Sequence, residues 1–155
     1  FRITPDIAAA GGHAKISTGA SHNKFGVSIG EAERLYARAA ASPHLRPVGL
    51  ACHIGSQITD LTPLERAYGV MRALVERLRS RGLTVERLDL GGGLGVPYFD
   101  QTSPPLPSAL AEMTARAIGG LGVELAFEPG RLIVANAGVL LATVVHVHER
   151  PDGPR

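Results

Sequence analysis

Cysteine is almost absent from this sequence of 155 residues, since Cys52 is the only one. A single cysteine excludes an internal disulfide framework and is typical of proteins kept in a reducing compartment, so we expect a cytoplasmic protein. No apolar run approaches the ~18 residues that a membrane-spanning helix needs, and no signal-peptide pattern opens the chain. The sequence therefore gives no reason to expect a membrane as a partner.

An excess of one charge is also missing. The 16 basic and 14 acidic residues leave a net charge of only +2, and they are spread along the chain without a run. Nucleic-acid-binding surfaces need clustered Lys and Arg, so no nucleic acid is expected as a partner. The length suffices for one substantial core but not for two comfortable domains. Because the chain begins Phe-Arg-Ile rather than with Met, we interpret it as a piece of a larger protein.

Short apolar segments alternate with amphipathic ones along the chain. Residues 48–54, 85–90 and 123–127 are predicted strands. A capping box at 62–65 predicts a helix that ends near Gly82, a similar signature at 28–31 begins an earlier helix, and 107–118 is a third. Strands that alternate with helices indicate an α/β protein with a parallel sheet.

A polar or glycine-rich cluster follows each predicted strand, at 53–57, 91–95 and 128–131. Barrel enzymes build their sites from many strand ends, whereas doubly wound sheets concentrate them at one switch point. The pattern favours a partial (β/α)₈ TIM-type barrel with about half of the strands, because a whole barrel needs ~250 residues. We assign residues 1–131 to this barrel. Residues 132–155 are then a linker and the first strand of a β domain.

Three consecutive glycines follow the second predicted strand. Gly91, Gly92 and Gly93 leave backbone N–H groups open to an anion, as phosphate-binding loops do. The segment is neither the dinucleotide fingerprint nor a Walker loop, and a flexible connector is the alternative interpretation. A side chain at Gly92 is expected to block the anion from the backbone amides and to leave the fold largely intact. A positive φ at this position is a second reason considered for the glycine.

The segment Glu128-Pro129-Gly130-Arg131 places a carboxylate and a guanidinium on either side of a turn. A carboxylate can hold the proton of a pyridinium ring, and Arg can fork onto a phosphate or a carboxylate. A simple type II turn is the alternative.

His53 ends a predicted strand, where it is interpreted either as a residue that faces the barrel mouth or as a hydrogen-bonded core histidine. Neighbouring strand residues point to opposite faces, so Cys52 is expected to be an inert buried thiol. His146 and His148 share a strand face and suggest the beginning of a metal site, but no third ligand follows at useful spacing, and we expect no metal.

Five segments together resemble the diaminopimelate decarboxylase branch of the pyridoxal-phosphate decarboxylases, whose barrel is like that of alanine racemase. Their order and spacing match over the chain up to about residue 149. The segments are HAKISTG (13–19), NKFG (23–26), HIGSQ (53–57), DLGGGLG (89–95) and EPGR (128–131).

The resemblance implies pyridoxal 5'-phosphate as the cofactor and residues 128–131 as part of its site, with Pro129 and Gly130 in the turn. His53 would stack on the cofactor ring, and Ser56 and the three glycines would hold the phosphate. Glu128 would pair with the pyridine nitrogen, and Arg131 would lie at the phosphate and the substrate carboxylate. The implied reaction is decarboxylation of meso-2,6-diaminopimelate to L-lysine, the last step of lysine biosynthesis, by a homodimer whose active site is completed across the interface.

Two family motifs are missing from this sequence. The Tyr-Ala-x-Lys motif that carries the Schiff-base lysine is absent, and neither Lys15 nor Lys24, which lie in an expected surface loop, matches it. The Cys-Glu motif of the partner subunit is absent too, and Cys52 is not its counterpart. No catalytic residue is therefore assigned, and the chain by itself is expected to be inactive. A related ornithine-type, arginine-type or carrier-bound-substrate decarboxylase and a non-catalytic cofactor-binding scaffold are the alternatives.

Overall fold

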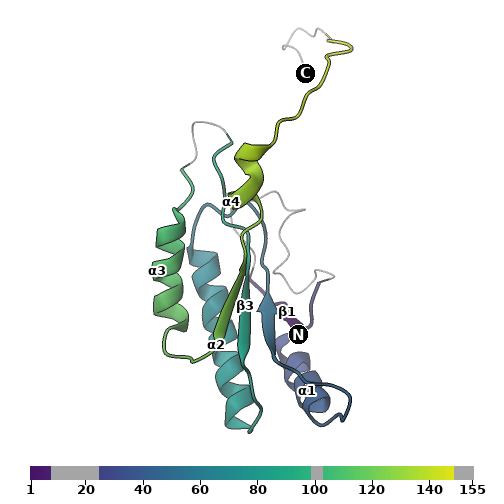
Figure 1. Cartoon of the computed structure of the whole chain (residues 1–155), viewed down its shortest axis with the longest axis vertical. Helices are drawn as coiled ribbons and strands as arrows, with labels where there is room; N and C mark the ends of the chain where they lie inside the picture. The colour runs from purple at the N-terminus through teal and green to yellow at the C-terminus, as the bar shows by residue number, and fades with distance from the viewer. Residues whose placement is uncertain (8–24, 99–102, 149–155) are drawn as a thin grey trace.

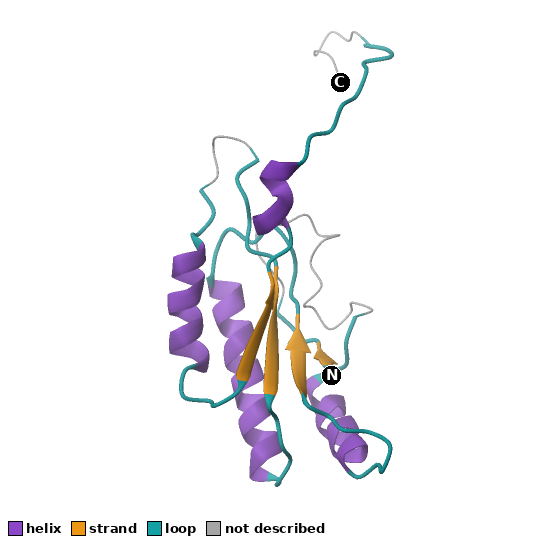
Figure 2. Ribbon diagram, viewed as in Figure 1, coloured by secondary structure: helices purple, strands orange, loops and turns teal. Residues whose placement is uncertain are grey.

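The computed structural model describes residues 1–7, 25–98 and 103–148. Within them, β-strands and α-helices alternate along the chain (Figures 1 and 2). The elements are β1 Arg2–Ile3, α1 Ile29–Ala40, β2 Gly49–Cys52, α2 Thr62–Ser80, β3 Arg87–Gly92, α3 Pro107–Ile118, β4 Glu124–Glu128, the short α4 Arg131–Val134 and a 3₁₀ turn, Ala135–Ala137.

The four strands form one parallel sheet in the order β1-β2-β3-β4. Every strand lies beside its neighbour in sequence, whereas a doubly wound sheet reverses its order at the switch point. Helices α1, α2 and α3 pack on one face of the sheet (Figure 2). The prediction of a partial (β/α)₈ barrel is therefore confirmed.

The core lies between the sheet and these helices. Leu50 and Cys52 of β2 and Leu88 and Leu90 of β3 are at most 2% exposed, because alternate strand residues point toward the helices. The apolar face of α2 is buried against them, and it includes Leu64, Tyr68, Met71, Leu74, Val75 and Leu78. This packing leaves the opposite face of the sheet to line the inside of the barrel.

The first turns of α1 and α2 are stabilised in different ways. The Ser28 side chain accepts a hydrogen bond from the Glu31 amide at 3.3 Å, which confirms the predicted cap of α1. The capping box predicted at 62–65 is wrong, because Thr62 is already helical. Asp60 lies two residues earlier, and its carboxylate accepts hydrogen bonds from both the amide (2.9 Å) and the hydroxyl (2.8 Å) of Thr62.

The ends of α2 and α3 match the sequence prediction closely. Gly82 adopts a φ of +77° just after α2, and its amide and that of Leu83 bond back to carbonyls of the last helical turn at 2.9 and 3.1 Å. Helix α3 has the predicted bounds. Arg72 of α2 donates to the carbonyls of Ala117 and Gly119, both at 3.1 Å, and thereby joins α2 to the end of α3.

Residues 138–148 form an extended segment that leads away from the body of the structure (Figure 1). No strand is assigned to this segment, so the assignment of 132–155 to a linker and the first strand of a β domain stays a prediction. Among the described residues, no helix has the length and apolar character needed to cross a bilayer.

Candidate functional site

A pocket of about 210 Å³ lies where β2, β3 and β4 end; we call it the mouth pocket. Seven of the nine predicted cofactor-binding residues line it, together with Gln57 and Leu94. The seven are His53, Ser56, Gly93, Glu128, Pro129, Gly130 and Arg131. The carboxyl ends of parallel strands meet at one edge, which explains how segments far apart in sequence come together here.

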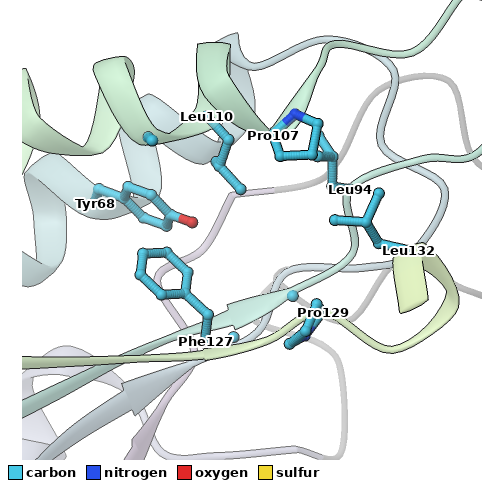
Figure 3. A pocket seen from close by; sticks show the side chains of 10 residues that line it. Tyr68, Leu94, Pro107, Leu110, Phe127, Pro129 and Leu132 are labelled. Carbon is cyan, nitrogen blue, oxygen red and sulfur yellow. The ribbon is translucent and has the colours of Figure 1, made fainter.

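Gly91 and Gly92 do not line the mouth pocket. They border a separate apolar cavity of about 250 Å³ on the helix side of the sheet, which Tyr68, Leu110 and Phe127 also line (Figure 3). Tyr68 brings the only side-chain polar atom in this lining, and burial raises the pKa of that phenol. The lining of this cavity carries no anion-binding side chain. The cofactor-binding role of Gly91 and Gly92 stays a prediction.

An irregular register at the end of β3 explains the different positions of the three glycines. Asp89 pairs with Ala126, but Gly92 pairs with Glu128, so β3 carries one extra residue, as in a β-bulge. The Asp89 carboxylate accepts a hydrogen bond from the Gly91 amide at 2.8 Å, and Gly91 has a φ of +67°. The bulge brings the backbone of Gly92 against β4.

The glycines are also required by close backbone packing. A Cβ on Gly92 would overlap the carbonyl oxygen of Glu128, and one on Gly93 would overlap that of Gly55. The expectation that a side chain at Gly92 leaves the fold largely intact is therefore wrong. Gly92 is not among the residues with positive φ, so close approach rather than a left-handed backbone excludes a side chain there.

Gly92→Ala is expected to lower the free energy of unfolding by ~1–3 kcal/mol, the usual cost of overpacking. Gly69 is the matched control, because it lies inside α2 with open space around the position of a Cβ. Gly69→Ala is expected to stabilise the chain by ~0.5–1 kcal/mol. Urea unfolding followed by circular dichroism measures both, and equal stability of wild type and Gly92→Ala would contradict the packing argument.

His53 connects the β2 and β3 ends of the site. Its Nδ1 accepts a hydrogen bond from the Gly92 amide at 3.3 Å, which leaves the proton of the neutral ring on Nε2. Burial, together with the nearby Arg2 guanidinium, lowers the pKa of His53, while Glu128 and Asp89 act in the opposite direction. The structure therefore favours a neutral ring at the pocket wall.

Lowering the pH is expected to destabilise the fold through His53. As the pH falls below 6.5, the unfolded chain takes up the proton before the folded chain does, so the stability is complete above 6.5 and is lost toward the lower folded pKa. Thermal melts between pH 7.5 and 5 should show a smaller decrease for His53→Gln than for wild type. His44→Gln, at an exposed position, is the control; identical pH profiles for all three proteins would refute this role.

Cys52 occupies the opposite face of β2 from His53. It is 2% exposed, and burial, with a smaller contribution from Asp89, raises the pKa of its thiol to about 12. Since the thiolate is the reactive form, Cys52 is an inert core residue, as predicted.

Two residues without a predicted role contact the site. Gln57 lines the mouth pocket, and the Tyr98 hydroxyl lies 3.4 Å from a guanidinium nitrogen of Arg131. Gln57 belongs to the predicted cluster 53–57, whereas Tyr98 lies 33 positions from Arg131, and no local sequence signal predicts that contact.

The remaining candidates are two lysines and two histidines. Lys15 and Lys24 lie outside the described residues. The rings of His146 and His148 are 6.4 Å apart, and the part of the chain that the structure describes contains no group of three potential metal ligands.

The mouth pocket combines groups suited to a phosphorylated ring. The Ser56 hydroxyl and the Arg131 guanidinium can donate hydrogen bonds to an anion, and the backbone at Gly93 carries no side chain. Glu128 offers a carboxylate and His53 a flat ring. The fold and pocket thus define a barrel segment whose strand ends form a ligand site.

Comparison with known proteins then identifies the family. Residues 1–135 match the family described as "Pyridoxal-dependent decarboxylase, pyridoxal binding domain", and the chain belongs to this family. It is 49% identical over 147 residues to a diaminopimelate decarboxylase of Pseudomonas aeruginosa, covering 95% of this chain and 35% of that protein. The chain thus spans about a third of the length of this curated relative.

Solved structures show the same relationship. A diaminopimelate decarboxylase from M. jannaschii in complex with L-lysine superposes with a TM-score of 0.82 at 35% identity, covering 99% of this chain and 37% of that one. A lysine/ornithine decarboxylase from Vibrio vulnificus complexed with cadaverine has a TM-score of 0.71 at 32% identity, covering 84% and 35%. Both similarities agree with the partial barrel.

Proposed function

We propose that this chain is the central part of the cofactor-binding barrel of a diaminopimelate decarboxylase. The complete enzyme would bind pyridoxal 5'-phosphate and convert meso-2,6-diaminopimelate into L-lysine and carbon dioxide. The observation that carries this proposal is the mouth pocket, where His53, Ser56, Glu128 and Arg131 meet from three separate segments. The similarity to named diaminopimelate decarboxylases supports this branch of the family.

Each residue has a role that its chemistry supports. Glu128 would hold a proton at the pyridine nitrogen of the cofactor, because a carboxylate stabilises the charged ring. His53 would pack its ring against the cofactor, and its bond from the Gly92 amide would fix its orientation. Ser56 and Arg131, with the backbone near Gly93, would bind the phosphate. Arg131 is also proposed to bind the substrate carboxylate.

Bound pyridoxal 5'-phosphate supplies the electron sink that accepts the electrons of the carbon–carbon bond when carbon dioxide leaves. The residues of this chain bind, orient and charge-balance that group. The lysine that anchors the cofactor is proposed to come from a barrel strand outside these 155 residues. A homodimer with a shared active site and a cytoplasmic location are also part of the proposal.

The test places residues 1–155 in the full-length Pseudomonas aeruginosa enzyme in exchange for the matching segment; we call this protein the full-length chimera. It is expected to release carbon dioxide from meso-diaminopimelate and to restore growth without lysine in a strain lacking the decarboxylase. Cofactor binding without turnover would favour the non-catalytic scaffold.

A control chimera distinguishes the neighbouring branch of the family. The same segment placed in the Vibrio vulnificus lysine/ornithine decarboxylase is expected to support little activity on lysine or ornithine. Greater relative activity in this background than in the Pseudomonas background would overturn the assignment to diaminopimelate.

A further inference from the structure

Gln57 has an unusual backbone conformation beside the mouth pocket. Its φ is +58°, and among the described residues only Asp6 and Gln57 have a positive φ without being glycine. The left-handed region is unfavourable for a residue such as Gln and persists only where the surroundings hold it. The contacts of the Gln57 side chain supply that support.

The carboxamide of Gln57 bonds to both polar backbone atoms of Val96. Its Nε2 donates to the Val96 carbonyl oxygen at 2.5 Å, and its Oε1 accepts from the Val96 amide at 3.3 Å. A donor and an acceptor presented together in this way reproduce the hydrogen bonding of a peptide group. The Gln57 side chain therefore pairs with the Val96 backbone in the way that the main chain of a neighbouring strand would.

This pair of bonds continues a short parallel ladder. The Ile58 amide donates to the Gly93 carbonyl, and the Gly95 amide donates to the Ile58 carbonyl, both at 2.9 Å. Together, the four bonds join the segment after β2 to the segment after β3. Ser56 precedes this ladder on one side and Gly93 begins it on the other, and both line the mouth pocket.

We propose that Gln57 is a positioning residue for the phosphate end of the cofactor site. Its carboxamide holds the Ser56 segment against the Gly93 segment, so that the hydroxyl and the bare backbone flank the same anion. This inference rests on the proposed function, because it takes the cofactor phosphate as the anion. Gln57 does not itself need to touch the phosphate.

Two substitutions remove the bonds between the Gln57 side chain and Val96 without adding backbone strain. Asn tolerates a positive φ but is one methylene shorter, so Gln57→Asn should not reach Val96 in the same way. Gln57→Gly removes the side chain and favours the left-handed backbone. Asp60→Ala is the matched control, because Asp60 lies in the same connection and bonds to backbone, but only at Thr62.

The experiment measures the affinity of the full-length chimera for pyridoxine 5'-phosphate and for pyridoxine. Neither ligand carries the aldehyde that reacts with lysine, so both report non-covalent binding. Gln57→Asn and Gln57→Gly are expected to raise the Kd for pyridoxine 5'-phosphate about tenfold and the Kd for pyridoxine less than twofold. The ³¹P resonance of the bound ester is expected to shift in both variants but not in Asp60→Ala.

The outcomes separate this inference from the proposed function. If the unsubstituted chimera does not prefer the phosphate ester over pyridoxine, the proposed cofactor site fails. If it does, and both Gln57 variants keep that preference and the ³¹P shift, Gln57 has no positioning role. An equal loss of affinity for both ligands would likewise contradict the positioning role of Gln57, since a general loss of stability would weaken the binding of both ligands alike.

Discussion

Glu128→Gln is expected to reduce kcat of the full-length chimera by a factor of ~10²–10³, or roughly 3–4 kcal/mol in the barrier. The substitution keeps the shape of the side chain but removes the charge that would stabilise a proton at the pyridine nitrogen. A less charged ring is a weaker electron sink, so decarboxylation slows while the cofactor still binds. Steady-state kinetics with saturating cofactor and a cofactor titration measure the two effects separately.

Glu124→Gln is the control for this prediction. Glu124 lies on the same strand and pairs with Arg87 at 2.8 Å, outside the mouth pocket. The kcat of the Glu124→Gln variant is expected to stay near that of the unsubstituted protein, since exposed ion pairs contribute little to stability. If Glu128→Gln turned over normally and lost only thermal stability, Glu128 would be a turn residue without a role at the ring.

Arg131→Lys is expected to weaken binding more than chemistry. Lys keeps the positive charge but loses the planar fork that bonds a phosphate or carboxylate through two nitrogens. We expect the cofactor Kd or the substrate KM to rise about tenfold, and Arg131→Ala to raise them ~100-fold, with a smaller effect of the lysine variant on kcat. The Tyr98 hydroxyl, 3.4 Å from the guanidinium, would lose its contact in both variants.

Arg87→Lys provides the matched comparison, because Arg87 lies on β3 and pairs with Glu124 outside the pocket. It is expected to leave both Kd and KM unchanged within twofold. A lysine variant of Arg131 with normal binding and a strongly reduced kcat would place this residue in the chemical step rather than at the anion.

Local sequence patterns were sufficient to predict the architecture and most of the residues of the mouth pocket. Alternating strand and helix patterns need only local periodicity, so the bounds of α3 and the end of α2 near Gly82 match the prediction. The assignment of Cys52 to the core follows equally from the alternation of strand side chains. Seven of the nine proposed cofactor-binding residues line one pocket because each lies at or just after the end of a strand, and parallel strands end at the same edge.

Other details depend on contacts between residues distant in sequence, and these became visible only in the folded chain. The extra residue in β3 brings Gly92 opposite Glu128, and the carbonyl of Glu128 excludes a side chain from Gly92. The bonds from Gln57 to Val96 join residues 39 positions apart. Such contacts arise only when β2, β3 and β4 lie side by side, because no local pattern encodes which backbone groups meet across neighbouring strands.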